Sequence, residues 1–191
     1  FAWDADLNKI QSTDENGHIT HMTYDDRGNL LTITDPLGGV TQFAYDPAYN
    51  MATSLTDPLT HTTIYAYDAR GNLSDVTDAL GNAAHYDYDV NGNLTATTDA
   101  RGRQTGYAYD AYGNLWAVVD PLSNRTEFTY DLAGNATGIK DAKGNATSLT
   151  YDAMNRVTRI LYPDTTGVSY AYDQVGNRVS MTDGKGNVTQ Y

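Results

Sequence analysis

The sequence contains no cysteine, few basic residues and no long apolar run. Without cysteine the chain forms no disulfide framework and no cysteine-ligated metal site. Twelve Lys and Arg stand against 24 Asp and Glu, a net charge of −12, which disfavours binding to nucleic acid phosphates and to anionic membrane surfaces. No stretch approaches the roughly 18 apolar residues of a membrane span. We therefore expect neither nucleic acid nor membrane insertion among its interactions.

A tyrosine–aspartate pair recurs along the whole chain at a nearly constant interval. The interval is 21 residues, except for one of 22 residues between Tyr45 and Tyr67. The pairs are Tyr24-Asp25, Tyr45-Asp46, Tyr67-Asp68, Tyr88-Asp89, Tyr109-Asp110, Tyr130-Asp131, Tyr151-Asp152 and Tyr172-Asp173, and Trp3-Asp4 stands one interval earlier. Fixed-period self-similarity is the signature of a repeat architecture.

The period predicts one array of about nine repeats over residues 1–191. The units start near residues 3, 24, 45, 67, 88, 109, 130, 151 and 172. Phe1 and Tyr191 both fall in mid-repeat, at equivalent positions. We therefore expect this array to be a fragment of a longer repeat protein.

Each repeat contains two turn signals separated by short runs of strand composition. The first is Asp-x-x-Gly-Asn after the tyrosine, where the carboxylate accepts nearby backbone N–H groups and glycine supplies a positive φ. The expected glycines are Gly28, Gly71, Gly92, Gly113, Gly134 and Gly176. The second signal begins at a further Asp, as at Asp99, and in three repeats carries Pro next. The runs Leu94–Thr98 and Gln104–Tyr109 then predict an all-β array of antiparallel hairpins with about two strands per repeat.

Side-chain alternation assigns faces to the second strand of each repeat. Thr105, Tyr107 and Tyr109 share one face of that strand. Stacking the repeats is expected to place aromatic side chains beside one another as ladders across the sheet. In the first strand, Leu73 and Val76 lie three places apart, which predicts a bulge or a strong local twist.

Three departures from the repeat carry predictions of their own. A bulge near Ala52–Leu55 is expected to absorb the extra residue of the 22-residue repeat. Tyr49 and Asn155 stand where glycine is expected. Tyr162-Pro163-Asp164 is expected to shift the second turn of its repeat.

The repeats resemble the RHS/YD-repeat family. The best matches run from Tyr67 through Asp89 and from Tyr24 through Asp46, where Tyr-Asp, Gly-Asn-Leu, Thr-Asp and a Tyr-x-Tyr-Asp or Phe-x-Tyr-Asp follow in order. The resemblance implies a long sheet that curves or spirals into a hollow shell, barrel segment or solenoid, as in bacterial Tc toxins, Rhs polymorphic toxins, wall-associated proteins and teneurins. In the bacterial toxins such a shell encloses a C-terminal toxic domain, and some members are associated with carbohydrate binding.

Two parts that the family's toxins possess are absent from these residues. The core region with self-cleaving aspartates and the variable toxic domain have no counterpart in residues 1–191. The resemblance therefore implies shell material here and carries no toxin activity onto this chain. A secreted, extracellular or cell-surface location follows from the same resemblance.

No residue pattern predicts a catalytic, metal or cofactor site. Asp89–Asn93 and Asp14–Gly17 faintly match a calcium loop but lack its closing bidentate Glu, so turn chemistry explains them better. His18 and His21 would suit a metal on a helix, but in a strand context they point to different faces, and His61 and His85 stand alone. Every aspartate has a turn explanation, so no acid–base pair stands out.

Tyrosine and asparagine offer the remaining candidates. The chain has 16 Tyr and 3 Phe, and a buried phenol needs a polar partner, so a half-wet surface suits this composition. The ligand-facing candidates are Tyr65, Tyr86, Tyr107 and Tyr170, with structural packing as the alternative explanation. Asn72, Asn93, Asn124, Asn135, Asn145 and Asn187 each begin an Asn-x-Ser/Thr sequon for glycosylation.

Three functions remain open on the sequence. The leading one is a structural module that builds an extracellular β-sheet shell, whose partners are neighbouring repeats and an encapsulated toxin domain. The second is a fibre subunit, because unpaired strand edges add further copies and head-to-tail addition keeps the period. The third is a carbohydrate-binding adhesin that uses exposed tyrosines. An enzyme is the weakest interpretation.

Overall fold

The computed structural model describes residues 1–191 as 19 β-strands with no helix. The all-β hairpin fold is therefore confirmed. None of the elements is a helix of the length and apolarity needed to cross a membrane. The strands are β1 (Ala2–Trp3), β2 (Lys9–Thr13), β3 (Ile19–Tyr24), β4 (Leu30–Thr34), β5 (Val40–Tyr45), β6 (Ala52–Thr56), β7 (Thr62–Tyr67), β8 (Leu73–Thr77), β9 (Ala83–Tyr88), β10 (Leu94–Thr98), β11 (Gln104–Tyr109), β12 (Leu115–Val119), β13 (Arg125–Tyr130), β14 (Ala136–Lys140), β15 (Ala146–Tyr151), β16 (Val157–Leu161), β17 (Gly167–Tyr172), β18 (Arg178–Thr182) and β19 (Val188–Gln190).

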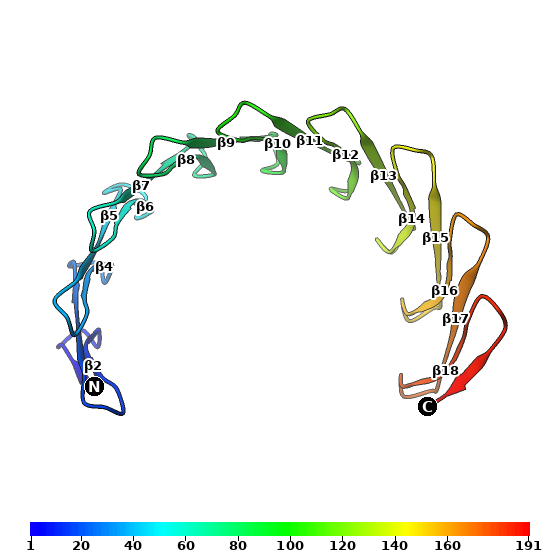
Figure 1. Cartoon of the computed structure of the whole chain (residues 1–191), viewed down its shortest axis with the longest axis horizontal. Helices are drawn as coiled ribbons and strands as arrows, with labels where there is room; N and C mark the ends of the chain where they lie inside the picture. The colour runs from blue at the N-terminus through cyan, green and yellow to red at the C-terminus, as the bar shows by residue number, and fades with distance from the viewer. The chain divides into compact units, whose positions relative to one another are not determined.

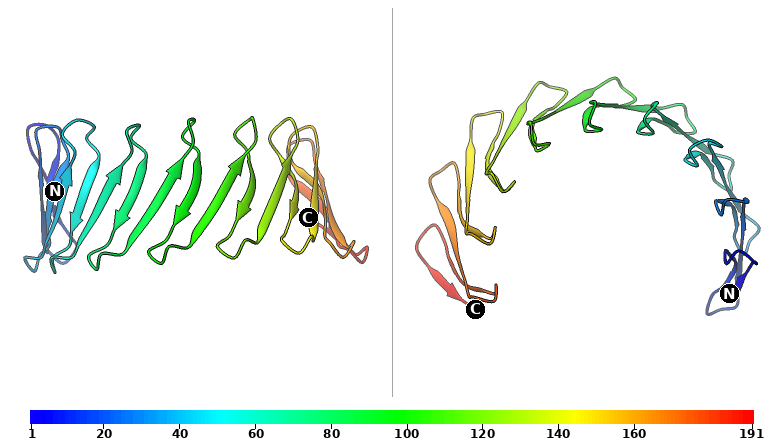
Figure 2. Two further views of the ribbon diagram at one scale, coloured as in Figure 1. Left: turned by 90° about the horizontal axis from the view of Figure 1, so that it is seen from above. Right: turned by 180° about the vertical axis from the view of Figure 1, so that it is seen from behind.

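The chain forms two compact units. The first comprises residues 1–88 and 97–103, and the second comprises residues 89–96 and 104–191. In the first unit β1 to β9 pair antiparallel in chain order (Figure 1). In the second unit β11 to β19 do the same. Figure 2 shows that turns join the strands at both of their ends, so each unit is a run of hairpins.

Two kinds of hairpin alternate within each unit. A hairpin closed by a Tyr-Asp pair, such as β7–β8, has four paired positions and a register shift between Ala66 and Tyr67. Tyr67 pairs with Leu73 and Ala66 pairs with Asp75, which leaves Ser74 as the bulged residue. The next hairpin, β8–β9, pairs over three positions without a shift. The bulge predicted from the spacing of Leu73 and Val76 is confirmed.

The sheet has one half-buried face and no dry core. In β3, Thr20, Met22 and Tyr24 are half-buried while the alternating residues are exposed. We call this side of each unit the tyrosine face and the other side the opposite face. Only Ala96 and Ala117 are buried in the whole chain. Hydrophobic burial is therefore spread thinly over every repeat rather than concentrated in one core.

The prediction that aromatic side chains of successive repeats lie directly opposite one another is wrong. Tyr65 lies opposite Val76, and Val76 lies opposite Ala84. Phe43 likewise lies opposite Leu55, which lies opposite Thr63. The register moves by two residues from one repeat to the next, so these aromatic side chains lie opposite aliphatic ones instead of opposite one another. The sequence period alone does not reveal this offset.

Candidate functional site

In the regular turn that follows a YD tyrosine, one aspartate takes part in five hydrogen bonds. In the repeat of Tyr67, the Asp68 N–H donates to the Asn72 carbonyl oxygen at 2.8 Å, and the Gly71 N–H donates to the Asp68 carbonyl oxygen at 3.0 Å. The carboxylate atom Oδ1 accepts the N–H groups of Arg70 and Asn72, and Oδ2 accepts the Asn72 side-chain amide. Gly71 has a φ of +88°, a left-handed conformation that favours glycine. The local sequence therefore specifies the turn completely.

These hydrogen bonds favour the ionised carboxylate. The Asn72 side-chain amide, followed by the Asn72 backbone N–H, lowers the pKa of Asp68 from its ordinary value. The same causes lower the pKa of Asp89 and Asp131 through Asn93 and Asn135. Most of the aspartates are thus built into the turns. Asp75 and Asp87 are exceptions to the expectation that every aspartate has a turn explanation, because they lie in strands β8 and β9.

The second turn of each repeat has the same geometry as the first. The Asp78 N–H donates to the Asn82 carbonyl oxygen at 2.9 Å, and its carboxylate accepts the N–H groups of Leu80 and Asn82 and the Asn82 amide. The sequence predicted that the turn at Tyr162-Pro163-Asp164 is shifted, and this prediction is wrong. Tyr162 takes the position of the aspartate, donates its N–H to the Thr166 carbonyl oxygen at 2.8 Å, and keeps the turn at its regular place.

The extra residue of the 22-residue repeat lies in a turn and not in the predicted strand bulge. The Asp46 N–H donates to the Met51 carbonyl oxygen, one residue later than in the other turns. Asn50, at φ +60°, takes the left-handed position, so Tyr49 does not stand in for glycine. Strand β6 then carries only the bulge that every YD hairpin has. A turn accommodates insertion at lower cost than a ladder, where one extra residue reverses the faces.

The two asparagines in left-handed positions connect neighbouring turns. Asn155, at φ +60°, accepts the Asn135 side-chain amide at 2.9 Å. Asn50 donates its amide to the Asn29 side-chain oxygen at 2.9 Å, and Asn29 donates back to Asn50. Asparagine tolerates this backbone conformation better than most residues, and here its side chain adds a contact between repeats that glycine lacks.

The hydroxyl groups of six YD tyrosines bind the backbone of the preceding repeat. Tyr151 donates to the Ala136 carbonyl oxygen at 2.7 Å, and Tyr67 donates to the Ala52 carbonyl oxygen at 2.8 Å. The acceptor always lies 15 residues upstream, at the first residue of a strand. The other four bonds are Tyr24 to Lys9, Tyr45 to Leu30, Tyr130 to Leu115 and Tyr172 to Val157.

These carbonyl groups need a partner because the ladder ends before reaching them. Strands β14 and β15 pair only through Gly138, Ile139 and Lys140 of β14. Ala136, two residues before Gly138, lies beyond this pairing, and the Tyr151 hydroxyl binds its oxygen. A half-buried carbonyl without a partner is costly, so the phenol satisfies the backbone and joins two repeats. This contact accounts for tyrosine over phenylalanine at the six YD positions that make it, and the sequence did not predict its long-range partner.

The four tyrosines proposed to face a ligand lie on the tyrosine face. Tyr65, Tyr86, Tyr107 and Tyr170 are half-buried there. Tyr65, Tyr107 and Tyr170 lie opposite Val76, Val118 and Met181. Arg178 stacks over the Tyr170 ring at 5.4 Å. Packing accounts for their positions, and ligand binding by this set stays a prediction.

The six sequon asparagines all stand at the last position of a turn. In each, the side-chain amide nitrogen donates to the carboxylate of the turn's aspartate, as Asn145 does to Asp141 at 2.7 Å. This nitrogen is the atom that would carry a glycan. Glycosylation would replace one of the two N–H groups of this nitrogen, directly beside the turn's carboxylate.

Three of the four histidines lie beside carboxylates. His18 and His61 lie 2.9 and 2.8 Å from Asp14 and Asp57 within their turns. On the opposite face of β9, the Nδ1 of His85 lies 2.7 Å from Asp75 and its Nε2 lies 3.2 Å from Asp87. Asp75 contributes most to raising the pKa of His85. No group of three or more potential ligands has metal-binding geometry.

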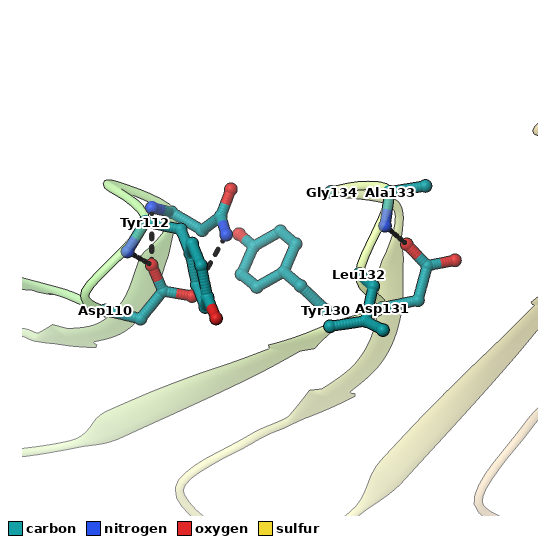
Figure 3. Close-up of a pocket in the computed structure, with 8 residues that line it drawn as sticks. Asp110, Tyr112, Tyr130, Asp131, Leu132, Ala133 and Gly134 are labelled. Atoms are coloured by element: carbon teal, nitrogen blue, oxygen red, sulfur yellow. Dashed lines mark hydrogen bonds between the residues drawn. The ribbon is translucent and has the colours of Figure 1, made fainter.

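A groove of about 550 Å³ lies between two successive YD turns of the second unit. Tyr112, Asn114, Tyr130 and Leu132 are among its lining residues. Figure 3 shows the Tyr130 ring pointing toward the turn of Asp110. The carboxylates of Asp110 and Asp131 are both occupied by their own turns, so the groove offers no acid–base pair.

The repeated hairpins and their tyrosine contacts define a tandem-repeat β protein built on Tyr-Asp turns. A model of the RHS repeat matches residues 3–39 and 24–62, and a model of the teneurin YD-shell matches residues 48–191. The chain therefore belongs to the RHS/YD-repeat family, in the group that the teneurin YD-shell model describes. No curated protein matches the chain significantly.

Solved structures of Tc toxins have the same fold. TcdB2-TccC3 without its hypervariable C-terminal region is 18% identical with a TM-score of 0.65, over 94% of this chain and 12% of that chain. TcdB2-TccC3 is 17% identical with a TM-score of 0.61, over 94% of this chain and 13% of the other. A Tc holotoxin pore of Photorhabdus luminescens, with a substituted TccC3, is 16% identical with a TM-score of 0.59, over 93% and 13%. This chain thus spans a small part of the length of these proteins.

Proposed function

We propose that this chain is a wall segment of a YD-repeat shell with a structural rather than a catalytic role. The observation that carries the proposal is the repeated tyrosine hydrogen bond, which at six YD positions joins a repeat to the one before it through the backbone. The teneurin YD-shell match over residues 48–191 supports it. Each added repeat contributes two strands and two turns, and most repeats add one such bond, so the wall grows by a regular rule.

The proposed shell is extracellular or at the cell surface and encloses an effector domain. Two lines support this part: the family's teneurin YD-shell model, and solved relatives described as a Tc holotoxin pore and as a protein with a hypervariable C-terminal region. The enclosed partner of this chain would be a domain of the same longer protein. The half-wet tyrosine face suits a wall whose inner or outer side contacts solvent.

Electron microscopy of the full-length parent protein tests the proposal. A hollow particle with a continuous wall is expected. Separate compact domains joined by linkers would contradict it, and so would open filaments, which are the expected result for a fibre subunit.

A further inference from the structure

Two turns carry an asparagine directly before their left-handed glycine. The pairs are Asn16-Gly17, in the second turn of its repeat, and Asn91-Gly92, in a YD turn. The other turns hold unrelated residues at the position of this asparagine, for example Arg70, Leu80 and Lys143. The turn geometry therefore does not require asparagine there, and the two pairs bring a chemistry that the other turns lack.

An asparagine that precedes glycine is open to attack by its own backbone. The glycine N–H loses its proton, the nitrogen bonds to the side-chain carbon Cγ, and the side-chain nitrogen leaves as ammonia. The product is a five-membered succinimide ring, and water opens it at either carbonyl to give aspartate or isoaspartate. Glycine favours the attack because, without a Cβ, it lets the backbone adopt the required conformation.

The folded turns leave both of these side chains free to react. Asn16 and Asn91 are exposed, as are the glycines that follow them. Each binds its turn's aspartate through the backbone N–H, at 2.9 and 2.8 Å, and the side-chain amide makes no hydrogen bond. A Cβ on Gly17 would meet no neighbouring atom within 4 Å. Attack on Cγ therefore breaks no side-chain contact.

The asparagines at the last position of the turns are protected by the same local structure. Asn93 donates its side-chain amide to Asp89 at 3.0 Å, and Asn145 donates to Asp141 at 2.7 Å. The next residue starts a strand and carries a side chain, as Ala146 does in β15. A turn such as that of Asp89 thus holds one reactive and one protected asparagine two residues apart.

One hydrogen bond of the turn opposes the reaction. The N–H of Gly17 donates to the Asp14 carbonyl oxygen at 3.1 Å, and the N–H of Gly92 donates to the Asp89 carbonyl oxygen at 3.2 Å. This bond has to open before the nitrogen reaches Cγ. Because a neutral hydrogen bond contributes little net free energy in water, its loss slows the reaction by about tenfold at most. The folded turn therefore delays the reaction without preventing it.

We propose that Asn16 and Asn91 are self-modifying sites, which convert in the folded protein to aspartate and isoaspartate with water as the only co-reactant. Isoaspartate lengthens the main chain by one carbon atom. The array accommodates this change, because the turn of Asp46 already holds one extra residue while β5 and β6 stay paired. Aspartate also fits, since Asp164 stands at the position of Asn16 in another turn. Each conversion adds one negative charge to a protein of net charge −12.

The experiment incubates the full chain at mildly alkaline pH, where the glycine nitrogen loses its proton more readily, and at mildly acidic pH. Peptide mapping by mass spectrometry locates the exchange of nitrogen for oxygen, and enzymatic methylation detects isoaspartate. We expect conversion at Asn16 and Asn91, faster at the higher pH, with the β-sheet circular dichroism unchanged. Asn91→Ala installs the residue that Ala133 provides in another YD turn, and it should leave conversion at Asn16 alone.

Ala146→Gly is the matched control for the role of the turn. It places glycine after Asn145, whose amide is bound to Asp141, and Gly167 occupies the same position in the next repeat. In urea we expect the asparagines at 91 and 145 of this variant to convert at similar rates, and in the folded protein only Asn91 should convert readily.

Three results would overturn the proposal. The first is conversion of Asn16 and Asn91 in urea but not in the folded protein. The second is equal conversion of Asn91 and Asn145 in folded Ala146→Gly, which would show that the turn does not select the site. The third is loss of the β-sheet signal as conversion proceeds, which would show that the array does not accommodate the product.

Discussion

The YD tyrosine combines two roles in one side chain. Its ring packs on the half-buried face, and its hydroxyl binds a carbonyl oxygen of the preceding repeat. Burial followed by the charge of Asp25 raises the pKa of Tyr45, which keeps that phenol protonated and able to donate. Packing alone would be met by phenylalanine, so the hydroxyl contact explains tyrosine at the six YD positions that make it.

Removal of one hydroxyl should therefore weaken the fold measurably. We expect Tyr151→Phe to lower the free energy of unfolding by about 1–2 kcal/mol, because the Ala136 carbonyl loses its donor in a half-buried place. Urea denaturation measures the change. Tyr112→Phe is the control, since Tyr112 is 84% exposed, and a similar loss in both variants would contradict the role given to Tyr151.

The type of residue at the left-handed position of a turn should determine how much backbone strain that turn carries. Thr60 has a φ of +70°, whereas Gly81 occupies the same position of the next second turn at +82°. A left-handed conformation costs a non-glycine residue about 1–2 kcal/mol, and β-branched residues adopt it least readily. We expect Thr60→Gly to stabilise the protein by about 1 kcal/mol, less than the full strain because glycine gains freedom in the unfolded chain.

Thermal or urea unfolding measures this change in stability. The reverse substitution, glycine to threonine, is the matched control. Gly81→Thr places the same strain in a turn that now lacks it, where a Cβ would meet no neighbouring atom within 4 Å. Any loss in that variant is therefore conformational. Stabilisation by Gly81→Thr would show that the backbone angle does not govern these turns.

Local chemistry was predictable from the sequence, and contacts across repeats were not. The Asp-x-x-Gly-Asn turn depends on five consecutive residues, so its geometry follows from their side chains alone. The acceptor of the Tyr151 hydroxyl lies 15 residues away and depends on where the β14–β15 ladder ends. The stacking of Arg125 on Trp116 likewise depends on strand register.

Hairpins differ in how they tolerate extra residues. The bulge of each YD hairpin was readable from the spacing of Leu73 and Val76, because that spacing is incompatible with one face of a regular strand. The site of the insertion was not readable, since the sequence between Tyr45 and Asp57 fits either a longer turn or a second bulge. The longer turn is favoured over a second bulge, because an extra residue in the turn at Asp46 leaves the pairing of the strands intact.

The β8–β9 hairpin should respond to pH through His85. Asp75 and, to a lesser degree, Asp87 raise the pKa of His85, so the charged imidazole stabilises the hairpin below the ordinary His value of 6.5. That stabilisation is lost as the pH rises through the raised pKa. We expect the urea midpoint of the wild type to exceed that of His85→Gln at about pH 5.5 and the difference to shrink by about pH 8.5.

Proton NMR provides the direct check on this hairpin. The His85 ring should titrate above 6.5, and Asp75→Asn should move its midpoint back toward that value. A midpoint that Asp75→Asn leaves unchanged would show that the 2.7 Å contact does not control the imidazole.

Stability in this chain is distributed because no single core exists. Only Ala96 and Ala117 are buried, and each YD tyrosine that binds a carbonyl reaches only the repeat before it. The fold then behaves as a series of units stabilised by their neighbours. Such an array has no preferred length, and the phase of the repeat at any junction matters more than the number of repeats.

Deletion of one whole period tests this directly. Removing Tyr67–Asp87 joins Ala66 to Tyr88 and restores a complete Tyr-Asp hairpin, so we expect a folded β protein with a cooperative transition. Removing Tyr67–Tyr86 instead leaves Asp87 as one extra residue inside a strand, which reverses the faces of the residues before it relative to the YD tyrosine. Circular dichroism and urea denaturation should show a large loss in the second variant only. The turn of Asp46 shows that one extra residue is tolerated when it lies in a turn. Equal stability of the two variants would therefore mean that an extra residue in a strand is tolerated as well, and that strand register does not govern the array.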